Sequence, residues 1–317
     1  MPGVDSVSAR APAKTNLVLL AGPLRADGYH EISTVYLALD VYDTLTLTPA
    51  EAGTGITVSV TGRDADAVPL DQSNVAHRAV RAVAERVGTT PDVSIRIDKQ
   101  IPVAGGMAGG SADAAAGLVA ANALWDAGLG DDALQDLAAG LGSDVPFSLL
   151  GGLALGTGRG EQLHPLDSGQ TWNLAVVPGD GGLATPAVFQ QLDHLRPHTG
   201  FADRHWSDDE VEAIVAAVVS GEPSRLEAAI ENDLQAAAIT LQPSLRARLL
   251  ALQAAGARTA WVSGSGPTCV GLCPVGTDPA DVVHHLAESG YGRAFTTTGP
   301  APGAHVVSPR SRPPSRR

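Results

Sequence analysis

The stretch PVAGGMAGGSADAAAGLVAAN, residues Pro102–Asn122, leads from the end of a strand through a glycine-rich loop into an alanine-rich helix. Glycines allow consecutive backbone N–H groups to converge on one ligand. Ser111 can cap the helix, whose first turn adds the positive end of the helix dipole. The stretch therefore predicts a cradle for phosphate oxygens, with a plain connecting loop as the alternative.

Two common nucleotide-binding loops are excluded by their motifs. The sequence contains no GK[ST], which a Walker A loop requires, and no G-x-G-x-x-G, which a dinucleotide fold requires. About thirteen residues, 98–110, separate the strand from the helix, too many for the tight first turn of a dinucleotide-binding unit. A phosphate loop of another class is therefore expected.

Alternating and periodic apolar residues on both sides of this loop predict a mixed α/β first half and an α+β second half. In the first half, strands are predicted at 15–20, 44–48, 56–60 and 93–97, and a helix at 75–87. In the second half, strands are predicted at 174–177, 259–263 and 268–272, and helices near 208–220, 224–238, 244–255 and 279–289.

A glycine- and proline-containing stretch, 158–173, predicts the boundary between two domains, 1–168 and 169–303. Residues 304–317 are rich in Pro, Ser and Arg and are predicted to form a disordered, dispensable tail. An arm that binds nucleic acid or another anionic surface is the alternative for this tail.

Composition limits the class of protein. With 44% hydrophobic and 17% charged residues the chain can bury sizeable cores, and its net charge of -13 disfavours binding to nucleic acid. No stretch is apolar enough to predict a membrane span. The two cysteines cannot form a disulfide framework or a complete zinc site, so a reducing, cytoplasmic compartment is expected.

Two side chains outside the loop are candidates for chemistry. Only two of the 21 basic residues are lysines, Lys14 and Lys99. The compact ammonium of Lys14 can approach both a hydroxyl nucleophile and a transferring phosphoryl group, although an ordinary strand-edge lysine is the alternative. Asp144 follows a helix stop in the segment GLGSDVPF and could equally cap a turn.

The glycine-rich loop resembles the phosphate loop of the GHMP kinase superfamily. That loop has a further glycine where this chain has Ala104, and Leu-Gly where it has Met107 and Ala108. The resemblance spans roughly residues 10–299. It implies a two-domain fold, with a first domain like the second domain of ribosomal protein S5, a ferredoxin-like α+β second domain, and ATP and substrate in the cleft between them.

The resemblance also implies the residues that bind Mg-ATP. Ser111 is the hydroxyl expected to reach Mg2+. Asn74 and Lys99 match positions near the adenosine, although they could equally be a loop cap and an exposed cation. The ATP phosphates are expected against Pro102, Val103, Ala104, Gly105, Gly106, Met107, Ala108, Gly109, Gly110, Ser111 and Ala112.

The segments AKTNL (13–17) and RADGYHE (25–31) resemble one branch of the superfamily, the kinases that phosphorylate the 2-hydroxyl of 4-diphosphocytidyl-2-C-methyl-D-erythritol in the non-mevalonate isoprenoid pathway. The resemblance implies that Asp144 is the general base and that Lys14 stabilises developing negative charge. It further implies that the substrate contacts Asn16, Tyr29, His30, Thr185, Phe189, Gly264, Ser265 and Gly266, with Tyr29, His30 and Phe189 around the cytosine.

Three functions remain open at this point. They are a kinase of that branch, a sister kinase with homoserine or mevalonate as acceptor, and a catalytically silent nucleotide-binding regulator. The aromatic residues favour the first over the second, because a small aliphatic acceptor has no use for an aromatic clamp. A small-molecule substrate, no nucleic-acid or membrane partner, and a monomer or homodimer are expected.

Overall fold

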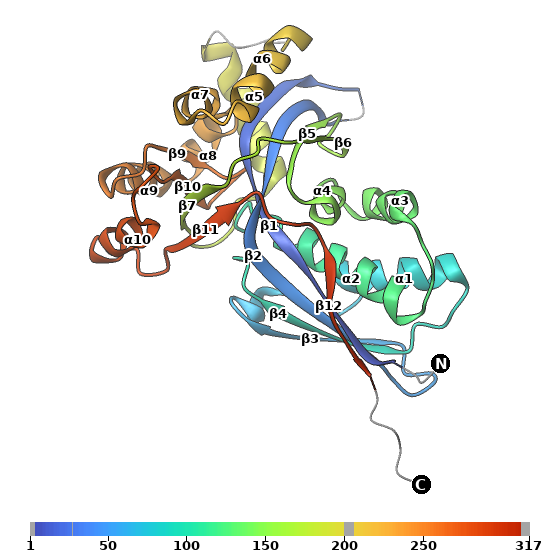
Figure 1. Cartoon of the computed structure of the whole chain (residues 1–317). Helices are drawn as coiled ribbons and strands as arrows, with labels where there is room; N and C mark the ends of the chain where they lie inside the picture. Colours follow the sequence, from blue (N-terminus) through green and yellow to red (C-terminus); the bar gives the residue numbers. More distant parts are fainter. Residues whose placement is uncertain (1–3, 27, 200–205, 312–317) are drawn as a thin grey trace.

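The structure is a computed structural model that describes residues 4–26, 28–199 and 206–311 (Figure 1). The larger of its two sheets has eight strands and a main path of β12-β1-β2-β4-β3. β5 and β6 extend this sheet from β2, and β8 pairs with β1 in parallel. The strands are β1 Val4–Leu24, β2 His30–Pro49, β3 Ile56–Gly62, β4 Val93–Lys99, β5 Leu153–Thr157, β6 Gln162–Leu166, β8 Glu231–Asn232 and β12 His305–Ser311.

Four α-helices lie on one side of this sheet: α1 Val75–Val87, α2 Gly109–Leu124, α3 Asp131–Leu141 and α4 Val145–Leu150 (Figure 1). A short 3-10 helix, η1 Ala65–Ala67, follows β3. Helix α2 is the central one. Ten of its residues are buried, as expected for a helix that is apolar on every side. Its small side chains allow close packing against α1, where a Cβ added at Gly117 would lie 3.4 Å from the carbonyl oxygen of Ala76.

The second sheet has four antiparallel strands in the order β11-β7-β10-β9. Numbered along the chain this order is 4-1-3-2, that of a ferredoxin-like domain, so the predicted α+β second domain is confirmed. The strands are β7 Trp172–Val177, β9 Thr259–Val262, β10 Cys269–Leu272 and β11 Phe295–Gly299. The helices around them are α5 Thr185–Thr199, α6 Asp208–Val219, α7 Pro223–Ala229, α8 Gln235–Leu241, α9 Ser244–Ala254 and α10 Pro279–Glu288.

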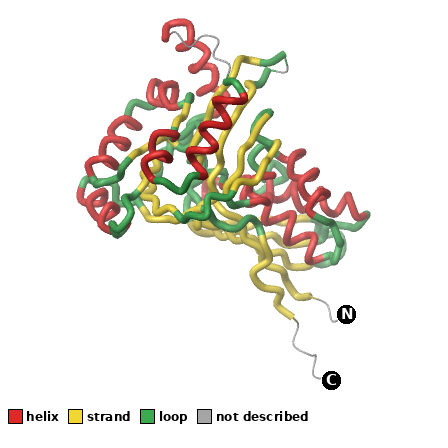
Figure 2. The backbone as a smooth tube through the Cα atoms, turned by 45° about the horizontal axis from the view of Figure 1, so that its top comes forward, coloured by secondary structure: helices red, strands yellow, loops and turns green. Residues whose placement is uncertain are grey.

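The long hairpin β1–β2 belongs to the first sheet but reaches the second domain, where its far end lies beside α5 (Figures 1 and 2). Arg196 of α5 donates hydrogen bonds to the carbonyl oxygens of Ala21 and Gly22 near the end of β1. The boundary expected at residue 168 falls between β6 and β7. The hairpin therefore extends side chains of the first domain into the space between the two domains.

The predicted helix at 224–238 is wrong, because the helical path is interrupted by β8. Asn232 donates from its side-chain amide to the carbonyl oxygens of Val262 and Gly264, both at 2.8 Å, and accepts from the N–H of Leu234. These bonds, of which the two to Val262 and Gly264 are long-range, replace the helical bonds of this segment. They also support the turn at Gly264.

The predicted disordered tail is also wrong for the residues that the structure describes. His305–Ser311 form β12, which pairs antiparallel with the edge of β1. The edge of β1 offers unpaired backbone N–H and C=O groups, which a returning extended segment can satisfy. Residues 312–317 of the predicted tail lie outside the described residues.

Candidate active site

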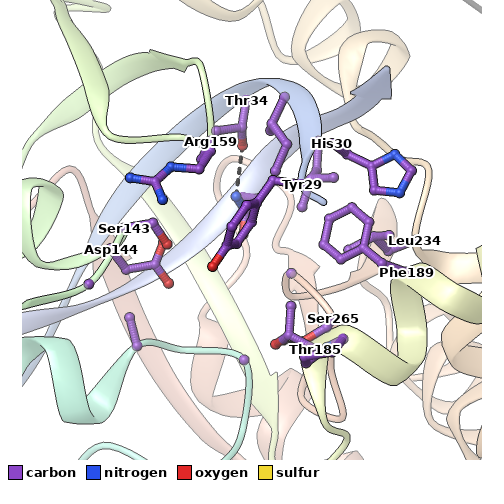
Figure 3. A pocket seen from close by; sticks show the side chains of 18 of the residues that line it. Tyr29, His30, Thr34, Ser143, Asp144, Arg159, Thr185, Phe189, Leu234 and Ser265 are labelled. Carbon is purple, nitrogen blue, oxygen red and sulfur yellow. Dashed lines mark hydrogen bonds between the residues drawn. The ribbon is translucent and has the colours of Figure 1, made fainter. Parts of the chain in front are cut away.

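A cavity of about 1080 Å³ lies between the two domains (Figure 3). Its wall is built from the middle of β1 and β2, the glycine-rich loop, the connection from α3 to α4, the start of α5 and the turn at 264–266. These segments carry the three sets of candidates from the sequence analysis. They are the glycine-rich loop, the pair Lys14 and Asp144, and the aromatic residues Tyr29, His30 and Phe189. The volume lies at the upper end of the range for ligand pockets.

The glycine-rich loop forms one end of the cavity. Its lining residues are Ala104, Gly105, Gly106, Ala108, Gly109 and Gly110. Helix α2 begins at Gly109, and the first N–H groups of a helix have no partner within it. Those donors and the helix dipole make this end of the cavity suitable for an anion.

Ser111 does not cap α2, so that prediction is wrong. The N-cap residue is Ala108, which has no side-chain cap bond, and Ser111 is the third residue within the helix. Val103 lines a second cavity of about 120 Å³, together with Asn74 and Lys99. Neither cavity is lined by Pro102, Met107, Ser111 or Ala112.

The two alanines that stand where the similar family has glycine have positive φ angles, +53° at Ala104 and +58° at Ala108. This left-handed region favours glycine, because a Cβ approaches the following carbonyl there. The loop thus takes a glycine-like path through alanine. The substitutions leave the cradle in place and add backbone strain to it.

Lys14 and Asp144 meet in the middle of the cavity. Lys14 Nζ lies 3.6 Å from Asp144 Oδ2 and donates to Asn16 Oδ1 at 2.9 Å. Lys14 is 6% exposed. Asp144 is the N-cap residue of α4, yet its side chain makes no cap bond. The carboxylate therefore faces the cavity, and the alternative of a capping aspartate does not hold.

Tyr36 is a site residue that the sequence analysis missed. Its hydroxyl donates to Asp144 Oδ1 at 3.2 Å, and its ring stacks on Phe147 with centroids 4.8 Å apart. Burial and the negative charge of Asp144 raise the pKa of Tyr36 well above its ordinary value, so the phenol remains a donor. In sequence, Tyr36 lies in an apolar strand and resembles a core residue.

The predicted aromatic residues gather at the other end of the cavity (Figure 3). The rings of His30 and Phe189 are stacked, with centroids 5.0 Å apart and planes at 17°. His30 Nδ1 lies 2.8 Å from the carbonyl oxygen of Gly22, so Nδ1 is the donor of that bond. Tyr29 is 54% exposed. Thr185 and Ser265, from different segments, share a hydrogen bond of 2.9 Å.

The turn at Gly264–Gly266 packs against the glycine-rich loop. Thr268 N–H donates to the carbonyl oxygen of Gly105 at 3.2 Å, and the Ser263 hydroxyl donates to that of Gly106 at 3.0 Å. A Cβ added at Gly106 would lie 2.3 Å from the carbonyl oxygen of Ser263. This contact joins the glycine-rich end of the cavity to the second domain and leaves no space for a side chain.

Lys99 is buried beneath the loop, so the alternative of an exposed cation is wrong. It donates to Asp43, to Asp113 Oδ2 at 2.7 Å and to the carbonyl oxygen of Gly109 at 3.3 Å. Burial alone would lower the pKa of Lys99, but the two carboxylates outweigh burial and raise it. Burial raises the pKa of Asp113 to about 8 against the opposing charge of Lys99.

Asn74 caps helix α1. Its Oδ1 accepts from the N–H groups of Ala76 at 2.9 Å and His77 at 3.3 Å, and its Nδ2 donates to the carbonyl oxygen of Pro69. The side-chain oxygen and nitrogen are both engaged within the protein. The role of Asn74 near an adenosine stays a prediction.

Two absences apply to the described part of the chain. Residues 4–26, 28–199 and 206–311 contain no group of three or more His, Cys, Asp or Glu side chains placed to hold a metal ion. Within the same ranges, no helix has the length and apolar character that crossing a membrane requires.

Comparison with known proteins places the chain in a family. The family profiles "GHMP kinases N terminal domain" and "GHMP kinases C terminal" match residues 74–152 and 214–292. The 4-diphosphocytidyl-2-C-methyl-D-erythritol kinase of Nocardia farcinica is 51% identical over 96% of this chain and 97% of its own length. The kinase of the same name from Rhodococcus jostii is 48% identical over 95% of each chain.

Solved structures agree in fold. A crystal structure of 4-(cytidine 5'-diphospho)-2C-methyl-D-erythritol kinase has a TM-score of 0.74 and 33% identity, covering 93% of this chain and 99% of that one. Homoserine kinase from Cytophaga hutchinsonii, at 18% identity and a TM-score of 0.70 over 96% of this chain and 98% of that one, shares the fold. The chain therefore belongs to the GHMP kinases, and within them to the family of the 4-diphosphocytidyl-2-C-methyl-D-erythritol kinases.

Proposed function

We propose that this chain transfers the terminal phosphoryl group of ATP to the 2-hydroxyl of 4-diphosphocytidyl-2-C-methyl-D-erythritol, producing the 2-phosphate and ADP. The observation that carries the proposal is the position of Asp144. Its carboxylate lies beside Lys14 in the middle of one cavity, between the helix N-terminus of the glycine-rich loop and the cluster of Tyr29, His30 and Phe189.

The two ends of the cavity suit the two substrates. Backbone N–H groups at Gly109 and Gly110 offer donors to the ATP phosphates. Tyr29 and Phe189 offer aromatic faces to a cytosine, and stacking on such a face contributes about 1 to 3 kcal/mol per base. The second, smaller cavity beside Val103 is the proposed place of the adenosine.

Phosphoryl transfer requires an aligned hydroxyl, an acceptor for its proton and stabilisation of the charge on the transferring group. In this proposal Asp144 accepts the proton of the 2-hydroxyl while the oxygen forms the new bond to phosphorus. The bond from the γ-phosphorus to the bridging oxygen breaks, and ADP leaves. Lys14 stabilises the negative charge that develops on the transferring group. Tyr36 and Asn16 hold the carboxylate and the ammonium in place.

The residues near the loop fit a magnesium ion that is held mainly by ATP. Mg2+ retains several waters and needs only one or two protein oxygens beside the substrate phosphates. Asp144, at the start of α4, would supply such an oxygen in the large cavity. Ser111, in the first turn of α2, lines neither cavity, so its role toward Mg2+ stays a prediction. When bound, the ion would neutralise charge on the β- and γ-phosphates.

ADP release with Mg-ATP tests the proposal, comparing the cytidylyl substrate with homoserine and mevalonate. We expect turnover with the cytidylyl substrate alone. Asp144→Asn should lower kcat by about 10²- to 10⁴-fold, because it removes the proton acceptor while retaining the shape of the side chain. Lys14→Met should lower it as well.

Asp136→Asn, at an exposed position on α3, is the matched control and should retain wild-type turnover. Near wild-type kcat in Asp144→Asn would refute the assignment of the base. Turnover with homoserine or mevalonate instead would refute the substrate. ATP binding without turnover of any acceptor would favour a nucleotide-binding regulator.

A further inference from the structure

The turn between β5 and β6 is held tightly against β2. Ile32 N–H donates to the carbonyl oxygen of Gly158 at 2.8 Å. Gly160 has a φ of +98°, and a Cβ added there would lie 2.3 Å from the hydroxyl oxygen of Tyr36. At Gly156 an added Cβ would lie 2.7 Å from the Tyr36 ring. Glycine is therefore required on both sides of the turn, and its backbone path is fixed by contact with Tyr36.

Arg159 lies between Gly158 and Gly160 in this turn, and its side chain lines the large cavity. Its backbone N–H donates to Glu161 Oε2 at 2.7 Å, and its Nε donates to Glu161 Oε1 at 3.4 Å. The guanidinium carbon lies 5.1 Å from the centre of the Tyr29 ring. The side chain is still 41% exposed. The guanidinium group is thus oriented by two neighbours while remaining open to a ligand.

The position of Arg159 is intermediate between the two ends of the cavity. In Figure 3 its guanidinium group lies on the side of Asp144, and Tyr29 separates it from His30 and Phe189. Any molecule that extends from the aromatic cluster to Asp144 must pass this part of the wall. The residue was not identified by the sequence analysis, because an arginine in a glycine turn resembles an ordinary surface residue.

The positive charge of Arg159 distinguishes it from most other residues that line the cavity. Among the described residues that line the large cavity, the side chains of lysine or arginine are Lys14 and Arg159. Lys14 is already placed between Asn16 and Asp144 and is almost fully buried. Arg159 is consequently the exposed cation in the middle of the cavity. The proposed substrate carries its two phosphates at the corresponding place, between the cytidine and the methylerythritol.

We propose that Arg159 binds the diphosphate group that links the cytidine to the phosphoryl acceptor, an inference that rests on the proposed function. A planar guanidinium group donates paired N–H bonds to phosphate oxygens and keeps its charge at every physiological pH. Glu161 and Tyr29 position it beforehand, which reduces the side-chain entropy lost on binding. Arg159 thereby sets the distance between the base-binding end and Asp144.

Equilibrium binding of CDP and of cytidine to the full chain tests this inference, with the ATP site filled by a non-hydrolysable ATP analogue and magnesium. The two probes differ only in the two phosphates. We expect Arg159→Gln to weaken CDP binding by about 10- to 100-fold, as for loss of a charged hydrogen-bonding partner, and to change cytidine binding by less than about 2-fold. Arg159→Lys should restore part of the CDP affinity.

Steady-state kinetics supply a second readout. Arg159→Gln should raise KM for the cytidylyl substrate and leave KM for ATP unchanged, whereas a variant with a disordered site would alter both. Arg225→Gln, an exposed arginine on α7 that is also paired with a glutamate, is the matched control. It should behave as the wild type in both assays.

The outcomes separate this inference from the proposed function. Wild-type turnover of the cytidylyl substrate, with CDP binding unchanged in Arg159→Gln, would overturn the inference alone. An equal loss of CDP and cytidine affinity would also overturn it, since that result indicates a structural role in holding Tyr29. A wild-type chain that neither binds CDP nor turns over the cytidylyl substrate would overturn both.

Discussion

The carboxyl group of Asp113, in the early part of α2, is buried beside Lys99 beneath the glycine-rich loop. One of its oxygens accepts from Lys99 at 2.7 Å, and the other has no hydrogen-bond partner. With Asp43 also bound to Lys99, two carboxylates share one ammonium group. Burial, together with the negative charge of Asp43, raises the pKa of Asp113 from 3.8 to about 8 against the charge of Lys99. The folded protein therefore retains a proton that the unfolded chain has lost.

This proton makes stability depend on pH. Because the folded-state pKa of Asp113 lies above its unfolded value, the free energy of unfolding falls as pH rises from about 4 to about 8. Asp113→Asn cannot lose a proton. We expect its stability relative to wild type to rise by more than about 1 kcal/mol between pH 5 and pH 8, as measured by urea unfolding at several pH values.

Asp136→Asn, at an exposed position, serves as the control and should follow the wild-type curve. Parallel pH profiles for Asp113→Asn and the wild type would show that Asp113 is ionised in the folded protein throughout this range. The cluster would then carry a net negative charge beneath the loop.

At the scale of the element, the loop and helix α2 combine a glycine-like path with alanine at two positions. Ala108 is both the N-cap residue of α2 and a residue with a φ of +58°. Alanine is unfavourable in each role, because a left-handed φ costs about 1 to 2 kcal/mol and alanine offers no side-chain cap. The alanine-rich helix therefore begins at a strained residue.

Ala108→Gly should stabilise the protein by about 0.5 to 1 kcal/mol. The relief of the left-handed φ exceeds the extra entropy that glycine gives to the unfolded chain. Ala123→Gly, at an exposed position in the last turn of the same helix, is the matched control and should destabilise. Urea unfolding measures both changes. Destabilisation of similar size in the two variants would show that Ala108 is not strained.

At the scale of the whole molecule, the chain leaves the second domain and returns to the first. Ala304 N–H donates to the carbonyl oxygen of Ser148 at 3.0 Å, and β12 then pairs with the edge of β1. Arg10 Nε donates to His305 Nε2 at 3.0 Å across this pair. β12, the last described strand, thus covers an edge of the larger sheet and joins the end of the described chain to its beginning.

Deleting residues 304–317 should therefore lower the free energy of unfolding by about 1 to 3 kcal/mol, since several backbone hydrogen bonds are lost. It should also promote association through the exposed edge of β1. A chain lacking only 312–317 retains β12 and should match the wild type. Urea unfolding and light scattering measure these effects, and equal stability of the two deletions would show that β12 contributes little.

The sequence by itself determined the class of fold, the glycine-rich loop, and Lys14 and Asp144 as separate candidates. These features depend on local signals, since apolar periodicity, runs of glycine and short motifs act within a few residues along the chain. Lys14 and Asn16, two residues apart on β1, likewise belong to one short motif, AKTNL (13–17). The predicted strands and most predicted helices were confirmed for this reason.

Only the tertiary structure decided which side chains meet across long separations. Tyr36 reaches Asp144 over 108 positions, and Thr185 reaches Ser265 over 80. β12 is polar enough to resemble a tail, yet an open sheet edge almost the whole chain away satisfies its backbone groups. Lys99 was read as a possible surface charge because burial and counter-charges from Asp43 and Asp113 exist only after folding. The physical reason is common to all: such contacts depend on topology, which local sequence does not encode.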